Sequence, residues 1–133
     1  MSVATIVPCL NQIEFHPYLQ QTEIVDFCHK NNILVAGYSV LTTLFRKPGG
    51  PIDSLVMALS KKYSKTPNQI LYQWLLQHNA VIITTSGNKD RLKEALEIFS
   101  ESKFKLDEVD FYKINSVGKE LEYRRFWSQE DWS

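Results

Sequence analysis

The chain of 133 residues has the length of a single domain, and its composition, 44% hydrophobic and 23% charged, is that of a globular protein. Fifteen basic residues balance fifteen acidic ones, so the charge gives no reason to expect a nucleic acid or a membrane surface as a partner. No apolar run approaches the roughly 18 residues of a membrane span, and the N-terminus lacks a signal-peptide pattern. These features predict a cytoplasmic protein.

The two cysteines are Cys9, in a predicted strand, and Cys28, in a predicted helix. Because disulfides are rare in the cytosol, we expect both to be reduced packing residues. Together with His16 they lack the spacing of zinc ligands. The sequence therefore predicts neither a disulfide nor a metal site.

Strand-like runs are predicted at residues 7–15, 33–39 and 80–85. Helical periodicity spans residues 22–31, where one apolar stripe consists of Ile24, Val25, Phe27 and Cys28. The second strand is followed by a long loop containing Pro48, Gly49, Gly50 and Pro51. A further apolar stripe then consists of Leu55, Val56, Leu59 and Tyr63.

A strong helix start lies at Thr66, which can cap the helix while Pro67 takes its first position and Gln69 completes a capping box. The predicted buried face behind it consists of Ile70, Leu71, Trp74 and Leu75. A helix is also predicted over residues 89–99, where the side chains that point one way are Leu92, Ala95, Leu96 and Phe99. Asp107 is expected to cap the last helix.

Alternating strands and helices predict an α/β fold with a parallel sheet and right-handed crossovers. Three parallel strands cannot close a barrel, and their edges would present unpaired backbone groups. The chain is therefore either a small open α/β layer or part of a larger fold.

Several short motifs occur in one order: NQIEFHPYLQ at 11–20, GYS at 37–39, KTPNQIL at 65–71, WLL at 74–76, TTS at 84–86 and RLKE at 91–94. In this order they resemble the C-terminal half of the aldo-keto reductases, NADP(H)-dependent oxidoreductases of carbonyl compounds, and the TTS version is most similar to fungal ketoreductases. The resemblance covers nearly the whole chain. It implies that residues 1–133 form a partial aldo-keto reductase domain, the C-terminal part of a (β/α)8 TIM barrel with three parallel strands, the sixth to eighth, and covering helices.

The resemblance also implies a cofactor cradle, because the C-terminal ends of barrel strands face the active site. Gln12 matches the residue that hydrogen-bonds the nicotinamide carboxamide, and Tyr38 matches the aromatic residue that stacks on the nicotinamide ring. Ser39, Leu41 and Thr43 match the start of the loop that passes over the pyrophosphate.

After the third strand, the resemblance implies that Ser86, Asn88 and Arg91 hold the adenosine 2′-phosphate. A guanidinium suits that task through its fixed fork of donors. Glu94 matches a position that contacts the adenine. The implied cofactor is NADP(H).

Some positions depart from the family pattern. Thr85 stands where many members have a phosphate-binding lysine, so NADP preference would rest mainly on Arg91. Ala95 replaces a frequent asparagine near the adenine. Val40 and Thr42 interrupt the common Ser-Pro-Leu-Gly loop, which alters the clasp over the cofactor.

The family's catalytic Asp, Tyr, Lys and His come from the first half of the barrel, so we expect no catalytic residue in this truncated chain. His16 belongs to the His-Pro-Tyr turn. A small-molecule carbonyl substrate is expected only if the missing half is supplied. Trp127 and Trp132 either line a substrate mouth or belong to a loosely packed tail.

Three hypotheses follow. The sequence is part of an NADPH-dependent carbonyl reductase, or a half-barrel that binds NADP(H) without chemistry, or an interaction protein or decayed remnant that self-associates through its open strand edges. We expect no nucleic-acid or membrane partner.

Overall fold

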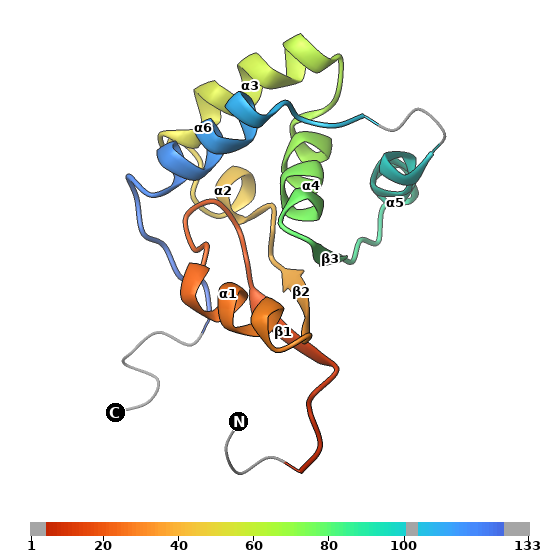
Figure 1. Ribbon diagram of the computed structural model, residues 1–133. Helices are drawn as coiled ribbons and strands as arrows, with labels where there is room; N and C mark the ends of the chain where they lie inside the picture. The colour runs from red at the N-terminus through yellow and green to blue at the C-terminus, as the bar shows by residue number, and fades with distance from the viewer. Residues whose placement is uncertain (1–4, 101–103, 127–133) are drawn as a thin grey trace.

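The computed structural model describes residues 5–100 and 104–126, and these form a three-stranded parallel sheet with helices packed around it (Figure 1). The strands, in spatial order, are β1 (Leu10–Glu14), β2 (Leu34–Tyr38) and β3 (Ala80–Ile83). Parallel pairing of β1 with β2 and of β2 with β3 confirms the predicted α/β class. All three strands are shorter than the runs that suggested them.

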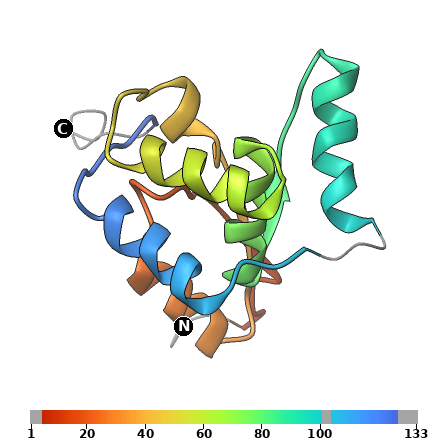
Figure 2. The ribbon, with the colours of Figure 1, turned by 90° about the horizontal axis from the view of Figure 1, so that it is seen from above.

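The helices follow the predicted order. They are α1 (Thr22–Lys30), α2 (Thr42–Phe45), α3 (Ile52–Tyr63), α4 (Pro67–Gln77), α5 (Lys89–Leu96) and α6 (Glu108–Gly118), with a short 3-10 turn at Glu97–Phe99 after α5. The single turn of α2 was not predicted, because the whole segment after β2 was expected to be a loop. Figure 2 shows α6 alongside α3, and α5 at the periphery of the molecule.

One face of the sheet is covered by helices. Successive side chains of a strand point to opposite faces, and the register places Ile13 of β1 beside Gly37 of β2 on one of them. A Cβ atom at Gly37 would lie 2.9 Å from both methyl carbons of Leu75. The glycine therefore lets α4 pack directly against the sheet on this face.

The other face of the sheet is open toward the N-terminal ends of the strands. Its outermost apolar side chains are 42% (Leu10), 58% (Leu34) and 49% (Val81) exposed. Toward the C-terminal ends of the strands, the same alternation brings Gln12, Glu14 and Tyr38 to this face. The polar strand residues thus gather at one end of the open face.

Helix α4 is the centre of the core. Its predicted face is fully buried and consists of Ile70, Leu71, Trp74 and Leu75. The capping box at its start is confirmed, since the Thr66 hydroxyl accepts from the Gln69 amide at 3.2 Å and the Gln69 side chain accepts from the Thr66 amide at 3.1 Å.

The apolar stripes of two other helices are covered only in part. In α1, Val25 and Cys28 are buried, whereas Ile24 and Phe27 remain exposed. In α5 and the turn after it, the exposed apolar side chains are Leu92, Leu96 and Phe99. Within the described ranges, no helix is both long enough and apolar enough to cross a membrane.

Candidate functional site

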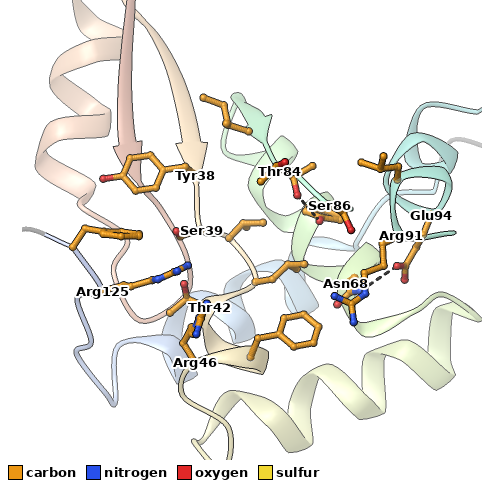
Figure 3. A pocket seen from close by; sticks show the side chains of 18 of the residues that line it. Tyr38, Ser39, Thr42, Arg46, Asn68, Thr84, Ser86, Arg91, Glu94 and Arg125 are labelled. Atoms are coloured by element: carbon orange, nitrogen blue, oxygen red, sulfur yellow. Dashed lines mark hydrogen bonds between the residues drawn. The ribbon is translucent and has the colours of Figure 1, made fainter. Parts of the chain in front are cut away.

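A cavity of about 580 Å³ opens at the C-terminal ends of β2 and β3. Its walls come from the strand ends, the loop into α2, the first turns of α4 and α5, and the segment that follows α6 (Figure 3). These segments are distant in the sequence, and the fold brings them together. The cavity lies where ligands bind in parallel α/β folds.

Seven of the nine residues predicted to contact a cofactor line this cavity. They are Gln12, Tyr38, Ser39, Leu41, Ser86, Arg91 and Glu94. The two that lie outside its lining are Thr43 and Asn88. Two groups of predicted residues, one near each end of the cavity, therefore face a common space (Figure 3).

The loop after β2 turns sharply at Ser39, whose φ of 60° is in the left-handed region that non-glycine residues seldom adopt. The turn is closed by a hydrogen bond of 2.9 Å from the Thr42 amide to the Ser39 carbonyl. Thr42 lines the cavity, whereas its neighbour Thr43 is fully buried away from it. Since α2 begins at Thr42, adjacent residues point in directions about 100° apart, and the sequence alone did not show which threonine faces the cavity.

At the other end, Asn88 serves as the N-cap of α5. Its side-chain oxygen accepts hydrogen bonds from the amides of Asp90, at 2.8 Å, and Arg91, at 3.2 Å. The Ser86 hydroxyl in turn accepts from the Asn88 amide at 3.0 Å. Asn88 thus orients the helix that carries Arg91.

Glu94 joins α5 to the start of α4. Its carboxylate accepts hydrogen bonds from the Thr66 hydroxyl and, at 3.1 Å, from the Asn68 side chain. Gln69 donates to the Glu94 carbonyl at 3.2 Å. Arg91, one turn earlier, places its guanidinium 5.6 Å from the centre of the Phe45 ring. The helix that follows β3 is therefore held mainly by polar contacts.

The cavity has a positive electrostatic balance. Three arginines line it, Arg46, Arg91 and Arg125, against the single carboxylate of Glu94. None of the ion pairs found within the described residues involves these arginines. Because uncompensated guanidinium groups in a concave site favour an anion, the cavity is suited to a phosphate-bearing ligand.

Sequence reasoning missed several residues of the lining. Asn68 and Tyr72 come from α4, and the Tyr72 hydroxyl lies 3.1 Å from that of Thr84.

Arg125 and Phe126 come from beyond α6, and the Phe126 ring meets Tyr38 edge-on with a centroid separation of 5.9 Å. No local pattern could have indicated a contact across so many residues. Trp127 and Trp132, the predicted mouth or tail, lie outside the described residues.

His16 is fully buried outside the cavity, and its Nε2 lies 3.0 Å from Oε1 of Glu14. Burial lowers the pKa of the imidazole, although the neighbouring carboxylate opposes this shift. The ring is thus a neutral structural group at pH 7. Within the part of the chain that the structure describes, no three His, Cys, Asp or Glu residues are placed to hold a metal ion.

Comparisons with known proteins agree with this geometry. The family model described as "Aldo/keto reductase family" matches residues 2–119. The NAD/NADP-dependent indole-3-acetaldehyde reductase of Schizosaccharomyces pombe is 35% identical over 133 residues, covering 98% of this chain and 46% of that protein. The aldo-keto reductase family 1 member A1-A of Danio rerio is 36% identical over 125 residues, covering 90% of this chain and 38% of that protein.

Solved structures give the same result for the fold. A Bombyx mori aldo-keto reductase in complex with NADP superposes with a TM-score of 0.82 at 30% identity, over 98% of this chain and 43% of that one. An aldo-keto reductase from a deep-sea metagenome library superposes with a TM-score of 0.80 at 29% identity, over 97% and 46% of the two chains.

The chain spans less than half the length of these curated relatives. Its three strands and their covering helices correspond to part of the (β/α)8 barrel of the superposed enzymes. The family match covers most of the sequence, and the cavity lies at the strand ends where that barrel carries its site. The chain belongs to the aldo/keto reductase family.

Proposed function

We propose that these 133 residues form the NADP(H)-binding part of an aldo-keto reductase that acts on aldehydes or ketones. The observation that carries the proposal is the single cavity that contains the Gln12 amide, the Tyr38 ring and the Arg91 guanidinium. Its volume of about 580 Å³ is within the range of small-molecule and cofactor sites. The bound group supplies hydride chemistry, and the residues described below hold it.

The strand end is proposed to receive the nicotinamide. Gln12 offers both a donor and an acceptor to a carboxamide, and Tyr38 offers an aromatic face. Ser39 and Leu41 line the next part of the cavity, where a pyrophosphate would pass. Thr43 supports that loop from its buried position.

The β3–α5 end is proposed to receive the adenosine and its 2′-phosphate. Arg91 and Ser86 line the cavity there, while Asn88 fixes the helix start by capping it. Glu94 faces the same end, but its carboxylate is engaged by Thr66 and Asn68. We therefore assign discrimination between NADPH and NADH to Arg91.

The test is a fluorescence titration of both nucleotides against the wild type and Arg91→Ala. A hydrogen bond to a charged group contributes about 1.5–3 kcal/mol, so the substitution should weaken NADPH binding about ten- to a hundredfold. NADH affinity should hardly change, since NADH has no 2′-phosphate. Lys89→Ala, in the same helical turn and outside the cavity lining, is the matched control. Equal affinities for the two nucleotides in the wild type, or equal losses in the variant, would refute the assignment.

We further propose that a polypeptide of these residues alone does not reduce carbonyl compounds. The titratable groups lining the cavity in the described structure are Tyr38, Tyr72, Arg46, Arg91, Arg125 and Glu94. The tyrosines have no lysine partner among the lining residues, so neither has the support that a proton donor needs. NADPH oxidation with aldehydes above a buffer control, surviving Tyr38→Phe and Tyr72→Phe, would contradict this.

A second candidate is a binding or interaction protein that self-associates. It is favoured by the uncovered apolar side chains on the open sheet face, Leu10, Leu34 and Val81, and by the unpaired outer edges of β1 and β3. Light scattering after size-exclusion chromatography tests it. A monomer with a sharp cooperative thermal transition would exclude this candidate, whereas an oligomer that binds neither nucleotide would favour it over the first.

A further inference from the structure

Glu14, at the C-terminal end of β1, has a side chain that is only 2% exposed. One oxygen, Oε1, lies 2.8 Å from the amide nitrogen of Arg125, and the other, Oε2, lies 3.0 Å from that of Phe126. Both amides donate to the carboxylate across more than a hundred residues of sequence. Two consecutive backbone N–H groups therefore clasp one buried side chain.

His16 provides the third donor to the same carboxylate, with its Nε2 at 3.0 Å from Oε1. The neutral imidazole carries its proton on Nε2, since that nitrogen faces the carboxylate and the buried Nδ1 has no hydrogen-bond partner. A buried carboxylate is costly unless donors surround it. The three donors thus fix the Glu14 side chain and, through it, the chain segment at residues 125 and 126.

The clasped segment forms a wall of the cavity. Arg125 and Phe126 both line it. The Phe126 ring lies edge-on to Tyr38 at 5.9 Å, and the Arg125 guanidinium lies 4.5 Å from the Phe126 ring. In Figure 3 the Arg125 side chain points toward Thr42 and Arg46, across from Tyr38.

We propose that Glu14, held by His16, is a positioning residue that sets this wall and thereby the fit of the cavity around a ring stacked on Tyr38. This inference rests on the proposed function, because the ring is taken to be the nicotinamide of NADP(H). Glu14 itself does not line the cavity, and it acts only through Arg125 and Phe126. It therefore affects the nicotinamide end of the ligand and leaves the adenosine end at Arg91 unaltered.

The first experiment probes the hydrogen bonds from Arg125 and Phe126 to Glu14 without any ligand, by amide hydrogen exchange on the labelled 133-residue chain. In Glu14→Gln, one acceptor oxygen is replaced by an amide group that faces a backbone donor. Exchange at Arg125 and Phe126 should become about ten- to a hundredfold faster, as expected for the loss of a charge-assisted hydrogen bond. Exchange at Ile13 in the sheet should stay the same. Unchanged exchange at Arg125 and Phe126 would overturn the proposal.

Glu122→Gln is the matched control, because it removes the same charge from an exposed position of the same segment. It should leave the exchange of both amides unaltered. A second measurement covers the case in which Glu14→Gln fails to fold. In the wild type, the Phe126 amide proton should show a nuclear Overhauser effect to the Glu14 side chain, and its absence would overturn the clasp.

The second experiment adds NADPH and, separately, adenosine 2′,5′-bisphosphate, which lacks the nicotinamide half. An edge-on aromatic pair contributes modestly, so Glu14→Gln and Phe126→Ala should each weaken NADPH binding about two- to tenfold. The double variant should lose no more than either single variant, since both act through one wall. Bisphosphate affinity should remain that of the wild type in all three.

The outcomes separate this inference from the proposed function. Additive losses, or an equal loss of bisphosphate binding, would show that Glu14 is merely structural and would overturn the positioning role. If the wild type binds neither nucleotide, the proposed function fails and the role at the nicotinamide falls with it, while the exchange data decide whether Glu14 builds the wall.

Discussion

Helices α4 and α5 have similar signatures in the sequence but different environments in the structure. Each begins with a side-chain cap and carries an apolar stripe. Seven of the eleven residues of α4 are buried, whereas α5 has none among its eight. Periodicity thus predicts that a helix forms, and it does not predict what covers the helix.

The difference divides the proposed site into two parts of unequal rigidity. Gln12 and Tyr38 lie on strands of the sheet against which α4 packs. Arg91 lies on α5, which is attached to the start of α4 through hydrogen bonds that Thr66, Asn68 and Gln69 donate to Glu94. Because local stability follows buried apolar contact, α5 should open more readily than the sheet.

The largest expected effect comes from one substitution made in both helices. Leu71 in α4 is 0% exposed and Leu96 in α5 is 69% exposed. Leu71→Ala should lower the free energy of unfolding by about 2–5 kcal/mol, and Leu96→Ala by less than about 0.5 kcal/mol. Urea denaturation at one fixed protein concentration measures both. Similar losses would mean that α5 is covered in solution, for example by a second copy of the chain.

A smaller effect should appear with pH at the C-terminal end of α4. His78 packs against Trp74 and Phe111 with ring centroids 4.6 and 4.8 Å away, and burial lowers the pKa of its imidazole. A hydrogen bond of 3.1 Å, donated by Nε2–H of His78 to Oδ1 of Asn115, opposes that shift. Burial among aromatic rings thus disfavours the charged form of His78.

The lowered pKa of His78 determines how stability changes with pH. The unfolded chain binds a proton at His78 below about pH 6.5, while the folded chain resists it until a lower pH. Stability is therefore complete above about pH 6.5 and falls toward pH 5, by at most about 1.4 kcal/mol per pH unit for each such histidine. His78→Gln should flatten this slope. A slope that His78→Gln leaves unaltered would contradict the assignment.

The last pair of substitutions removes the caps of the two helices. Thr66→Ala and Asn88→Ala should each cost about 0.5–2 kcal/mol of helix stability. The Thr66 loss should appear in global unfolding, because α4 is the core. The Asn88 loss should appear only as faster amide exchange within α5. Faster global unfolding in Asn88→Ala would show that the two helices form one cooperative unit.

Much of this fold could be predicted from the sequence, because helix caps and buried helix faces depend on residues close together in the chain. The capping box at Thr66, the Asp107 cap, which accepts from the Asp110 amide at 2.8 Å, and the buried face of α4 were all predicted. The one turn of α2 was not, since its four residues are too few for a periodic pattern.

The residues of the site could be predicted from the sequence only in part. Gln12, Tyr38 and Arg91 follow strand ends or a helix start, and their motifs resemble a known family. Arg125 and Phe126 come from beyond α6, and their amides donate to the buried Glu14 carboxylate. Such a long-range contact has no signature in a single sequence.

The most direct test of the central claim is to map amide chemical shifts on the labelled chain during separate titrations with NADPH and NADH. If one cavity holds the whole nucleotide, NADPH should shift the amides of Gln12 and Tyr38 together with those of Ser86 and Arg91, and it should slow exchange in α5. NADH should shift the first pair as strongly but Ser86 and Arg91 less, and it should slow exchange in α5 less than NADPH does, because it lacks the 2′-phosphate. Shifts confined to the apolar surface around Ile24 and Phe27, or the same response of α5 to both nucleotides, would contradict the account.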